Sequence, residues 1–304
     1  MPDVFRSPEL GDQKEAALPQ GTVRYYERGS GEPIVFLHGL MVNANLWRKV
    51  VPSLAQRFRC ITPDLPLGSH GQALNADADL SPPAIAGLIA DFLGALKLEG
   101  VTLVGNDTGG ALAQIVATQH PRRIARLVLT NCDAFGNFPP AMFRPLQWQA
   151  RVPGALRVIA LALKVRPLRR LPLAFGWLTK RPIEDQVMDS YLAPALEVAG
   201  VMRDLRKALV AISPRYTRAA AEKLPAFDRP VLIAWAPEDP FFPWKHAERL
   251  RDAFPRARLE SVEDCRAFVP EDQPERLAEL IAGFMDETAK APVAPEKKPE
   301  GAAR

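Results

Sequence analysis

An aspartate between two glycines, in the segment Gly105-Asn106-Asp107-Thr108-Gly109, is the strongest chemical signal in the sequence. An apolar run precedes the segment and a helical pattern follows it, so we expect a strand that turns sharply into a helix. Glycine suits the flanks of such a turn because it has no side chain to collide. The carboxylate at the apex then stands beside a helix N-terminus, chiefly the Thr108 N–H, where an anion or a developing oxyanion is favoured.

The composition is that of a soluble globular protein. The chain has 304 residues, of which 47% are hydrophobic and 24% charged, and its net charge of +4 is too small to suggest a nucleic-acid partner. Cys60, Cys132 and Cys265 lie far apart, so we expect no disulfide framework, no metal site and no cofactor. Residues 1–20 have no apolar segment typical of a signal peptide, which predicts a cytoplasmic protein.

Strand and helix patterns alternate on both sides of this segment. Residues 21–31 alternate like an antiparallel strand followed by a turn. Short apolar runs predict buried strands at residues 33–37, 60–62, 103–106, 127–130, 230–235 and 259–262. Helical patterns lie at residues 46–57, 81–96, 108–120, 274–284 and from 244 onward. This alternation indicates an α/β fold in which right-handed crossovers build a mostly parallel sheet with helices on both faces.

One long segment breaks the alternation. Residues 138–221 show no strand pattern and are predicted to form a helical cap, or lid, inserted between two strands of the sheet. The core is then expected in residues 21–137 and 222–287. A polar lead-in at residues 1–20 and a disordered tail at 288–304 complete the predicted domain organisation.

Other motifs accompany the acidic turn and together suggest a family. His38-Gly39 follows a predicted strand, and Pro237-Glu238-Asp239 follows a late one. With the helical insertion, the chain over residues 21–287 resembles the α/β-hydrolase fold, which implies a twisted, mostly parallel, eight-stranded sheet with an inserted cap. Because an aspartate holds the apex, it looks most like the branch of haloalkane dehalogenases and epoxide hydrolases.

The resemblance implies a role for each matching residue. Asp107 would be the nucleophile, attacking an sp3 carbon to form an alkyl-enzyme ester that a histidine-activated water hydrolyses. The backbone N–H groups of Leu40 and Thr108 would form the oxyanion hole. Asp239 matches the acid that orients the histidine, and Asp133 is a second place where related enzymes carry that acid.

The histidine that the resemblance requires is absent, and its position is held by Ala267. A positioned general base contributes roughly 10²–10⁴-fold in rate, so an ester on Asp107 is expected to persist. His70 lies in a loop at the carboxyl ends of the strands, and is either a replacement base or substrate contact, or only a loop residue. His38 is either a positioning residue or a substrate contact. We expect His246 to face solvent.

Two further comparisons concern the reaction. Dehalogenases hold the departing halide with a tryptophan after the nucleophile and often an asparagine after His-Gly, where this sequence has Thr108 and Leu40. Dehalogenation is therefore the weaker interpretation. Epoxide hydrolases use cap tyrosines as donors, and the cap here contains Tyr191 and Tyr216, which are either catalytic or packing residues.

The cap combines basic and apolar residues. Between residues 144 and 181 there are nine lysines and arginines and no acid. One interpretation is a basic apolar surface that rests on a membrane or admits an acidic amphipathic substrate. The other is a lid that buries its apolar face over the active site and keeps its basic residues in water. Either way we expect an apolar pocket lined by Phe135, Phe138, Phe143, Trp148, Phe175 and Trp177.

Three hypotheses follow for function. The first is a hydrolase of this fold that uses Asp107 on a hydrophobic small molecule, breaking an epoxide, ester or related bond. The second is a binding protein that lost turnover with the histidine. The third is a non-hydrolytic catalyst in which Asp107 acts as an acid or base. An exposed carboxylate beside an oxyanion hole favours catalysis, because a pure binder has no need of one.

Overall fold

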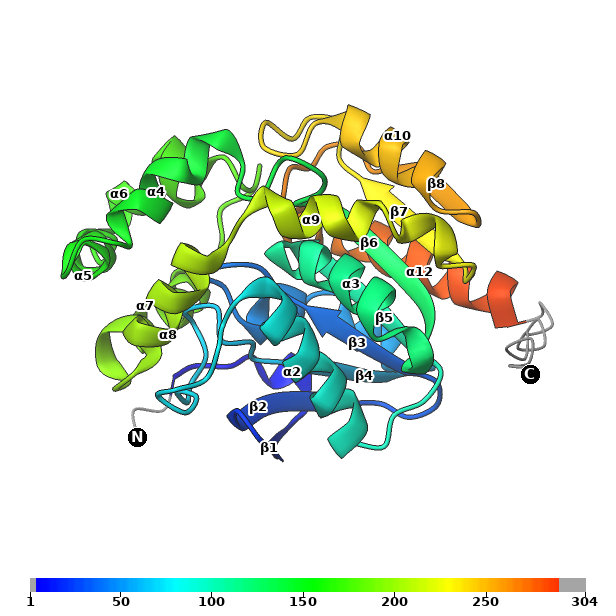
Figure 1. Ribbon diagram of the computed structural model, residues 1–304, viewed down its shortest axis with the longest axis horizontal. Helices are drawn as coiled ribbons and strands as arrows, with labels where there is room; N and C mark the ends of the chain where they lie inside the picture. Colours follow the sequence, from blue (N-terminus) through cyan, green and yellow to red (C-terminus); the bar gives the residue numbers. More distant parts are fainter. Residues whose placement is uncertain (1–3, 290–304) are drawn as a thin grey trace, which may run out of the picture.

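The computed structural model describes residues 4–289, which form an eight-stranded sheet with strand order β1-β2-β4-β3-β5-β6-β7-β8 (Figure 1). The strands are β1 (Asp12–Leu18), β2 (Gly21–Arg28), β3 (Pro33–Leu37), β4 (Arg59–Pro63), β5 (Val101–Asp107), β6 (Ile124–Cys132), β7 (Val231–Trp235) and β8 (Ala257–Ser261). The β1–β2 and β2–β4 pairs are antiparallel, and the others are parallel. The predicted fold class is therefore confirmed.

The sheet is most apolar at its centre. Nearly every residue of β3, β5, β6 and β7 is buried, as expected for parallel strands that helices cover on both faces. β5 pairs with β3 on one side and β6 on the other, and Asp107 is its last residue. The acid therefore lies at the carboxyl edge of a central strand, where open α/β sheets bind ligands.

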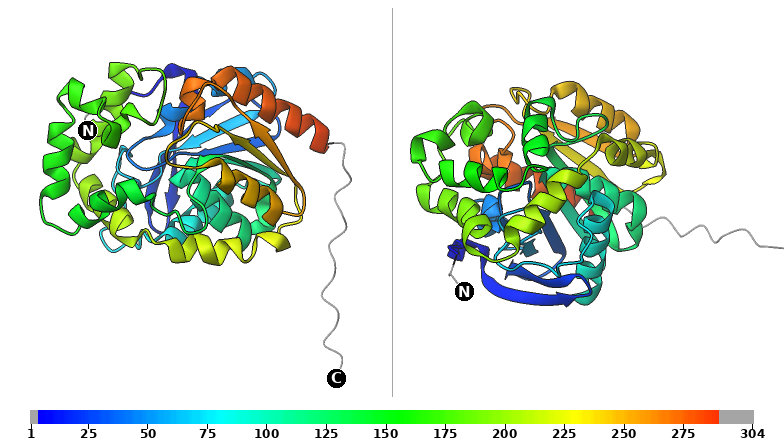
Figure 2. Two further views of the ribbon diagram at one scale, coloured as in Figure 1. Left: turned by 90° about the horizontal axis from the view of Figure 1, so that it is seen from above. Right: turned by 60° about the vertical axis from the view of Figure 1, so that its left-hand side comes forward.

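Helices cover both faces of the sheet (Figure 2). The core helices are α1 (Val51–Leu54), α2 (Pro82–Ala95), α3 (Thr108–Gln119), α9 (Pro214–Ala221), α10 (Trp244–Ala253), α11 (Val269–Asp272) and α12 (Pro274–Ala289). Short helical turns are η1 (Pro8–Leu10), η2 (Ala44–Trp47), η3 (Pro121–Arg123), η4 (Ala141–Phe143) and η6 (Leu224–Ala226). The single helix predicted at 46–57 is wrong: η2 ends at Trp47 and α1 restarts with Pro52 in its first turn, a position that proline favours.

The cap helices lie together at one end of the molecule (Figure 1). They are α4 (Arg144–Gln149), α5 (Ala155–Ala162), α6 (Arg166–Arg169), the turn η5 (Pro172–Gly176), α7 (Asp185–Glu197) and α8 (Val201–Ala211). α9, although inside the predicted cap range, packs along α3 and belongs to the layer that covers the sheet. Its buried face, which includes Thr217 and Ala220, explains this placement.

The two ends of the core differ from the prediction. The lead-in contains β1, which pairs with β2, and Leu10, which is fully buried. At the other end α12 continues to Ala289, and Thr288 donates a hydrogen bond to the Phe284 carbonyl at 2.7 Å. The rest of the predicted disordered tail lies outside the described residues.

Polar contacts hold the cap on the core. Asn43 Nδ2 donates to the Ser190 carbonyl at 2.9 Å, and Asn45 Nδ2 donates to Ser190 Oγ at 2.8 Å. Ser69 Oγ donates to the Tyr191 carbonyl at 2.6 Å. These contacts join loops at the carboxyl edge of the sheet to α7 of the cap. Within residues 4–289, every helix is too short or too polar to cross a bilayer.

Candidate active site

The turn between β5 and α3 forces Asp107 into an uncommon backbone conformation. Its φ is 54° and its ψ is −131°, a region that non-glycine residues rarely occupy and that is found mostly at functional sites. The neighbouring glycines are required for space. A Cβ at Gly105 would lie 2.6 Å from the Gly109 carbonyl oxygen, and one at Gly109 would lie 2.3 Å from the Leu37 carbonyl oxygen. The sequence pattern thus has a steric cause.

The Asp107 carboxylate faces two backbone donors. The N–H groups of Thr108 and Leu40 both hydrogen-bond to it, and a Cβ at Gly39 would lie only 2.0 Å from its Oδ2. Burial raises the pKa of Asp107 to about 7 against the opposing effect of these donors, and the charge of Asp239 adds to the rise. The structure therefore brings together the acid and the two N–H groups that the sequence singled out.

Asp239 lies beyond the end of β7 and is held by three donors. Its Oδ1 accepts from the Phe241 N–H at 2.8 Å, its Oδ2 accepts from Asn131 Nδ2 at 2.7 Å, and the Phe242 N–H also donates to it. Burial raises the pKa of Asp239 to about 7 despite these bonds, which lower it. Asn131 was missed by sequence reasoning, although an amide inside the apolar run of β6 was the available signal.

Asp133, directly after β6, is a third buried acid of this site. Its Oδ2 accepts from Thr108 Oγ1 at 3.2 Å, and its Oδ1 has no hydrogen-bond partner among the described residues. Burial, and then the charge of Asp107, raise the pKa of Asp133 well above its usual value. The environment of Asp133 therefore favours its protonated form more than that of an exposed aspartate does.

Position 267 lies next to the acidic turn. The Ala267 carbonyl accepts from Asn106 Nδ2 at 2.7 Å, and the same amide donates to Thr130 Oγ1 at 2.8 Å. The Ala267 side chain is fully buried. The loop in which the resemblance expects a histidine is thus bonded to the residue before Asp107, with a methyl group in place of an imidazole.

His38 has both ring nitrogens occupied by backbone. Its Nε2 accepts from the Leu65 N–H at 2.8 Å, so its Nδ1 carries the proton and donates to the Gly39 carbonyl at 2.9 Å. Burial lowers the pKa of His38 to about 4, so the ring is neutral. Both ring nitrogens of His38 are therefore bonded to backbone groups, which leaves neither free for the predicted substrate contact.

The remaining histidines are engaged elsewhere. His70 is buried and its Nε2 lies 3.3 Å from Oδ2 of Asp204 on the cap helix α8. His246 is also buried, against the ring of Phe135, so its predicted exposure is wrong. None of the histidines in residues 4–289 has a hydrogen bond to Asp107. A base role for His70 stays a prediction, and the contact observed is with the cap.

Some of the predicted pocket residues gather near the acid. Phe138 is fully buried in an apolar cluster with Ala111 of α3, Ile212 of the cap and Leu40, whose N–H faces Asp107. Phe143 is half-buried and its ring lies 5.0 Å from that of Phe241. This cluster places apolar surface beside the donors of the site.

The other predicted pocket residues lie elsewhere. The Phe135 ring lies under the Arg249 guanidinium at 3.9 Å, and the Phe175 ring stacks on that of Tyr191 at 6.3 Å. Trp148 is 72% exposed and Trp177 is 39% exposed, so neither lines an enclosed pocket in this structure.

The two cap tyrosines have different surroundings. Tyr191 is buried, and its hydroxyl has no hydrogen-bond partner within residues 4–289. Tyr216 is half-buried, and its hydroxyl bonds to Arg215, whose guanidinium also stacks over the ring at 4.5 Å. A donor role for either remains a prediction.

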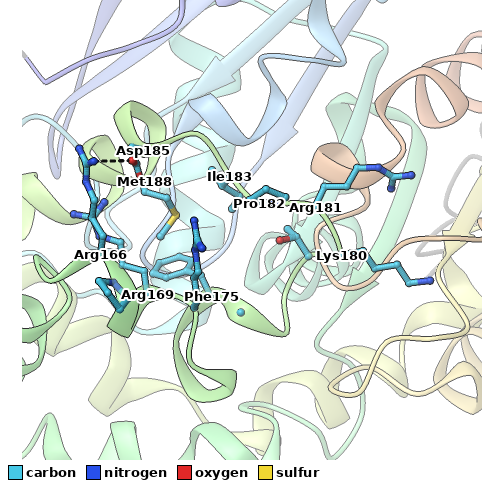
Figure 3. A pocket seen from close by; sticks show the side chains of 13 residues that line it. Arg166, Arg169, Phe175, Lys180, Arg181, Pro182, Ile183, Asp185 and Met188 are labelled. Carbon is cyan, nitrogen blue, oxygen red and sulfur yellow. Dashed lines mark ion pairs between the residues drawn. The ribbon is translucent and has the colours of Figure 1, made fainter.

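The clefts of the described part of the chain include three with volumes of about 730, 370 and 770 Å³, and Asp107 does not line these three. The first lies in the cap and is lined by basic residues that include Arg166, Arg169 and Arg181 (Figure 3). The sequence indicated the charge of this segment but not its concentration around a cleft. No group of histidine, cysteine and acidic residues in residues 4–289 is arranged to hold a metal ion.

Comparison with known proteins agrees with this architecture. The sequence profile of the alpha/beta hydrolase fold matches residues 32–274. The chain belongs to the α/β-hydrolase fold family. It is 30% identical over 297 residues to an uncharacterized protein of Mycobacterium tuberculosis, with 89% of this chain and 81% of the relative covered.

Two further relatives of this α/β-hydrolase have named activities. A cis-3-alkyl-4-alkyloxetan-2-one decarboxylase of Xanthomonas campestris is 28% identical over 289 residues, covering 88% of this chain and 93% of the relative. Haloalkane dehalogenase 2 of M. tuberculosis is 28% identical over 267 residues, covering 86% of this chain and 91% of the relative.

Solved structures of this fold superpose well. Haloalkane dehalogenase DbeA from Bradyrhizobium elkani gives a TM-score of 0.76 at 20% identity, covering 91% of this chain and 98% of that one. Epoxide hydrolase CorEH gives a TM-score of 0.75 at 20% identity, covering 91% of this chain and 99% of that one. At such identities the likeness concerns the fold alone.

Proposed function

We propose that this α/β-hydrolase is an enzyme in which Asp107 attacks carbon in a hydrophobic small molecule. The observation that carries the proposal is the Asp107 carboxylate at the strained turn, hydrogen-bonded by the N–H groups of Leu40 and Thr108. The apolar cluster around Phe138 adjoins these donors and favours a hydrophobic substrate.

The first step follows from this arrangement. One carboxylate oxygen of Asp107 forms a bond to an sp3 carbon, and the electron pair of the broken C–O bond goes to the departing oxygen. The other carboxylate oxygen becomes the ester carbonyl and keeps its bonds to the N–H groups of Leu40 and Thr108. The side chains of Leu40 and Thr108 offer little to hold a halide ion. The bond broken in the substrate is therefore more suitably a C–O bond than a carbon–halogen bond.

The second step has to proceed without an imidazole. Ala267 cannot take a proton from water, so hydrolysis of the ester loses the roughly 10²–10⁴-fold that a positioned base contributes. For an epoxide or a simple ester, the covalent intermediate on Asp107 is expected to accumulate.

A β-lactone is a second candidate substrate class, favoured by the alanine at position 267 and by the decarboxylase activity for which the Xanthomonas relative is named. Attack of Asp107 on C4 of an oxetan-2-one breaks the C4–O1 bond and releases a carboxylate. The C2–C3 bond then breaks and carbon dioxide leaves. The electron pair of the broken C2–C3 bond forms the C3=C4 double bond. The bond from C4 to Asp107 breaks in the same step and returns the carboxylate. This route needs neither water nor a general base.

Intact-protein mass spectrometry tests both candidates. The protein is incubated with an aryl epoxide, an activated ester, an alkyl halide or a cis-3,4-dialkyl β-lactone, and Asp107→Asn serves as the control. We expect an epoxide adduct that maps to Asp107, and alkene release from the lactone without a lasting adduct. Neither adduct nor turnover across the panel would favour the binding-protein hypothesis, and turnover that survives in Asp107→Asn would contradict the nucleophile.

A further inference from the structure

Exposed apolar side chains concentrate in one part of the cap. Nine large hydrophobic side chains are exposed in the described chain, and eight of them lie between residues 142 and 177. These eight are Met142, Trp148, Val152, Val158, Leu161, Val165, Leu171 and Trp177. The segment comprises α4, α5, α6 and η5, which project from the body of the molecule (Figures 1 and 2). Such a concentration on a soluble chain marks an interaction surface.

Helix α5 shows the feature most clearly. Leu156 and Ala160 face inward and are 6% and 1% exposed. Val158 and Leu161 face outward and are 66% and 47% exposed. A helix that only covers an active site has a polar outer face. The outer face of α5 is apolar, with Arg157 beside Val158, so it is suited to an environment less polar than water.

The same segment is basic. From Arg144 to Ile183 the sequence has no aspartate or glutamate. Its exposed arginines 144, 151, 157 and 170 have no acidic partner within residues 4–289. Apolar side chains interspersed with unpaired cations are the composition of protein surfaces that bind anionic membrane interfaces.

The basic cleft of the cap, whose lining residues are drawn in Figure 3, is close in sequence to this surface. Arg166 and Arg170 line it and are neighbours in sequence of the exposed Val165 and Leu171. Its basic lining residues are Arg166, Arg169, Arg170, Lys180 and Arg181, against a single acid, Asp185.

Acidic side chains of the protein pair with most of the basic residues that line the cleft. Asp185 pairs with Arg166 at 3.0 Å. Arg169 is 7% exposed and pairs with Asp189 at 2.6 Å, but its Nη1 has no hydrogen-bond partner in the described chain. Lys180 pairs with Glu238 at 2.6 Å, and Arg181 pairs with Asp264 at 2.5 Å. Arg170 is therefore the basic lining residue that has no acidic partner in the described chain, and it is available to an anionic group such as a lipid phosphate.

We propose that the outer surface of the cap, residues 142–181, docks on an anionic lipid bilayer. The exposed Trp148 and the outer residues of α5 enter the interfacial layer, where tryptophan is favoured. The unpaired arginines, of which Arg170 lines the cleft, receive the phosphate groups of the lipids. This inference is independent of the chemistry at Asp107, and it places the cap where hydrophobic molecules partition.

Vesicle sedimentation tests the proposal with the full chain. Vesicles of phosphatidylcholine alone are compared with vesicles that contain about 30% phosphatidylglycerol, a fraction chosen to make the surface strongly anionic. We expect binding to the anionic vesicles only. Salt at 0.5 M should weaken this binding, because it screens the attraction between the arginines and the lipid phosphates.

Removing one surface cation costs about 1 kcal/mol, or about fivefold in binding, so Arg157→Ala with Arg170→Ala should reduce binding about 25-fold. Arg122→Ala, an exposed arginine of η3 without an acidic partner in the described chain, is the matched control and should bind like the wild type.

A second readout follows the apolar contact. Tryptophan emission should shift to shorter wavelength on binding anionic vesicles, and Trp148→Ala should lose most of that shift while keeping its far-ultraviolet circular dichroism. Equal binding to both vesicle types, no binding, or unchanged binding of the double variant would overturn the proposal. So would self-association in sedimentation velocity that the same substitutions abolish, because the surface would then be an interface between two copies. Labelling of Asp107 in solution should be the same in these variants as in the wild type, so a failure of vesicle binding can be told apart from a failure of the proposed activity.

Discussion

At the scale of single residues, the consequence of alanine at position 267 is electrostatic as well as catalytic. Asp107, Asp133 and Asp239 are buried near one another, and burial is the largest cause of the raised pKa of each. An imidazolium at position 267 would offset part of this effect. Arg266 is the cation that acts on Asp239, and it lowers the pKa of that acid without restoring it to the usual range.

The pKa of Asp107 predicts the pH dependence of its attack on carbon. Only the carboxylate is nucleophilic, so the rate of adduct formation should rise about tenfold per pH unit below pH 7 and level off above it. Because the charge of Asp239 raises the pKa of Asp107, Asp239→Asn should move the midpoint to lower pH. Rates of labelling between pH 5 and about 8.5, measured by mass spectrometry, give both midpoints. A midpoint unchanged in Asp239→Asn would show that the two acids do not interact.

Asp133 should destabilise the fold at high pH. Its pKa is raised in the native state, so its contribution to stability is present at low pH and is lost as pH rises toward the folded pKa. Asp133→Asn keeps an oxygen to accept from Thr108 and carries no charge. The free energy of unfolding of this variant, relative to wild type, should therefore increase by about 1.4 kcal/mol per pH unit above pH 4 until the folded pKa is reached. Urea titrations at pH 5 and 8 measure the difference, and a gap that shrinks with pH would contradict the account.

At the scale of elements, the close approach of two loops fixes the carboxylate. The loop after β3 passes so near the turn after β5 that a Cβ at Gly39 would lie 2.0 Å from Asp107 Oδ2. Gly39→Ala should therefore displace the carboxylate from its donors and reduce labelling of Asp107 by at least about 100-fold, as loss of an oxyanion donor does in other enzymes.

A matched glycine provides the control. Gly87 lies inside α2, and a Cβ at this position would have open space around it for 4 Å, so Gly87→Ala should leave labelling unchanged. Because it also removes a flexible residue from a helix, it should stabilise the protein by about 0.5–1 kcal/mol. Labelling of Gly39→Ala at the wild-type rate would show that the two loops are not rigidly apposed.

Local patterns predicted most elements but not their contacts. The turn at Asp107 was predictable because glycine spacing and apolar periodicity are local. β1 was missed because its first four residues are polar or charged and exposed, so the strand has no apolar run in the sequence. The apolar residues of α5 fit a lid helix that buries one face, yet Val158 and Leu161 are exposed, since periodicity does not say which side of a helix meets the core.

Contacts between distant segments were beyond sequence reasoning for the same reason. Asn131 and Asp239 are 108 positions apart, and His70 and Asp204 are 134 apart. Each residue type was visible, but the pairing depends on the way that strands and cap helices pack. The sequence therefore offers His70 as a base, whereas its observed partner is on α8 of the cap.

At the scale of the whole molecule, Asp204 joins the cap to the core. Its Oδ2 accepts from the Leu74 N–H at 2.9 Å and lies 3.3 Å from His70 Nε2, and its Oδ1 accepts from Arg203 Nε at 2.9 Å. Burial would raise the pKa of Asp204, but the bonds from these three groups outweigh burial and lower it. A carboxylate with a lowered pKa stabilises the fold above its unfolded pKa and loses that effect as pH falls through the folded value.

Asp204→Asn should therefore loosen the cap. We expect the free energy of unfolding to fall by about 1–3 kcal/mol at pH 7, with a smaller loss near pH 3.5, and cap segments to become more sensitive to protease. Asp252→Asn is the control and should change stability little, because Asp252 is exposed and, among residues 4–289, pairs only with its neighbour Arg251, at 2.8 Å. Equal stability of the two variants in urea titrations would show that Asp204 does not fasten the cap.

The most direct test of the account compares wild type with Ala267→His after exposure to an aryl epoxide. If Asp107 attacks carbon and only the base is missing, wild-type protein gains the full mass of the epoxide at Asp107 and releases little diol. Ala267→His should release diol at least about 100-fold faster and retain less adduct. An unmodified Asp107 in both proteins, or a wild type that turns over the epoxide as fast as Ala267→His, would contradict the central claim.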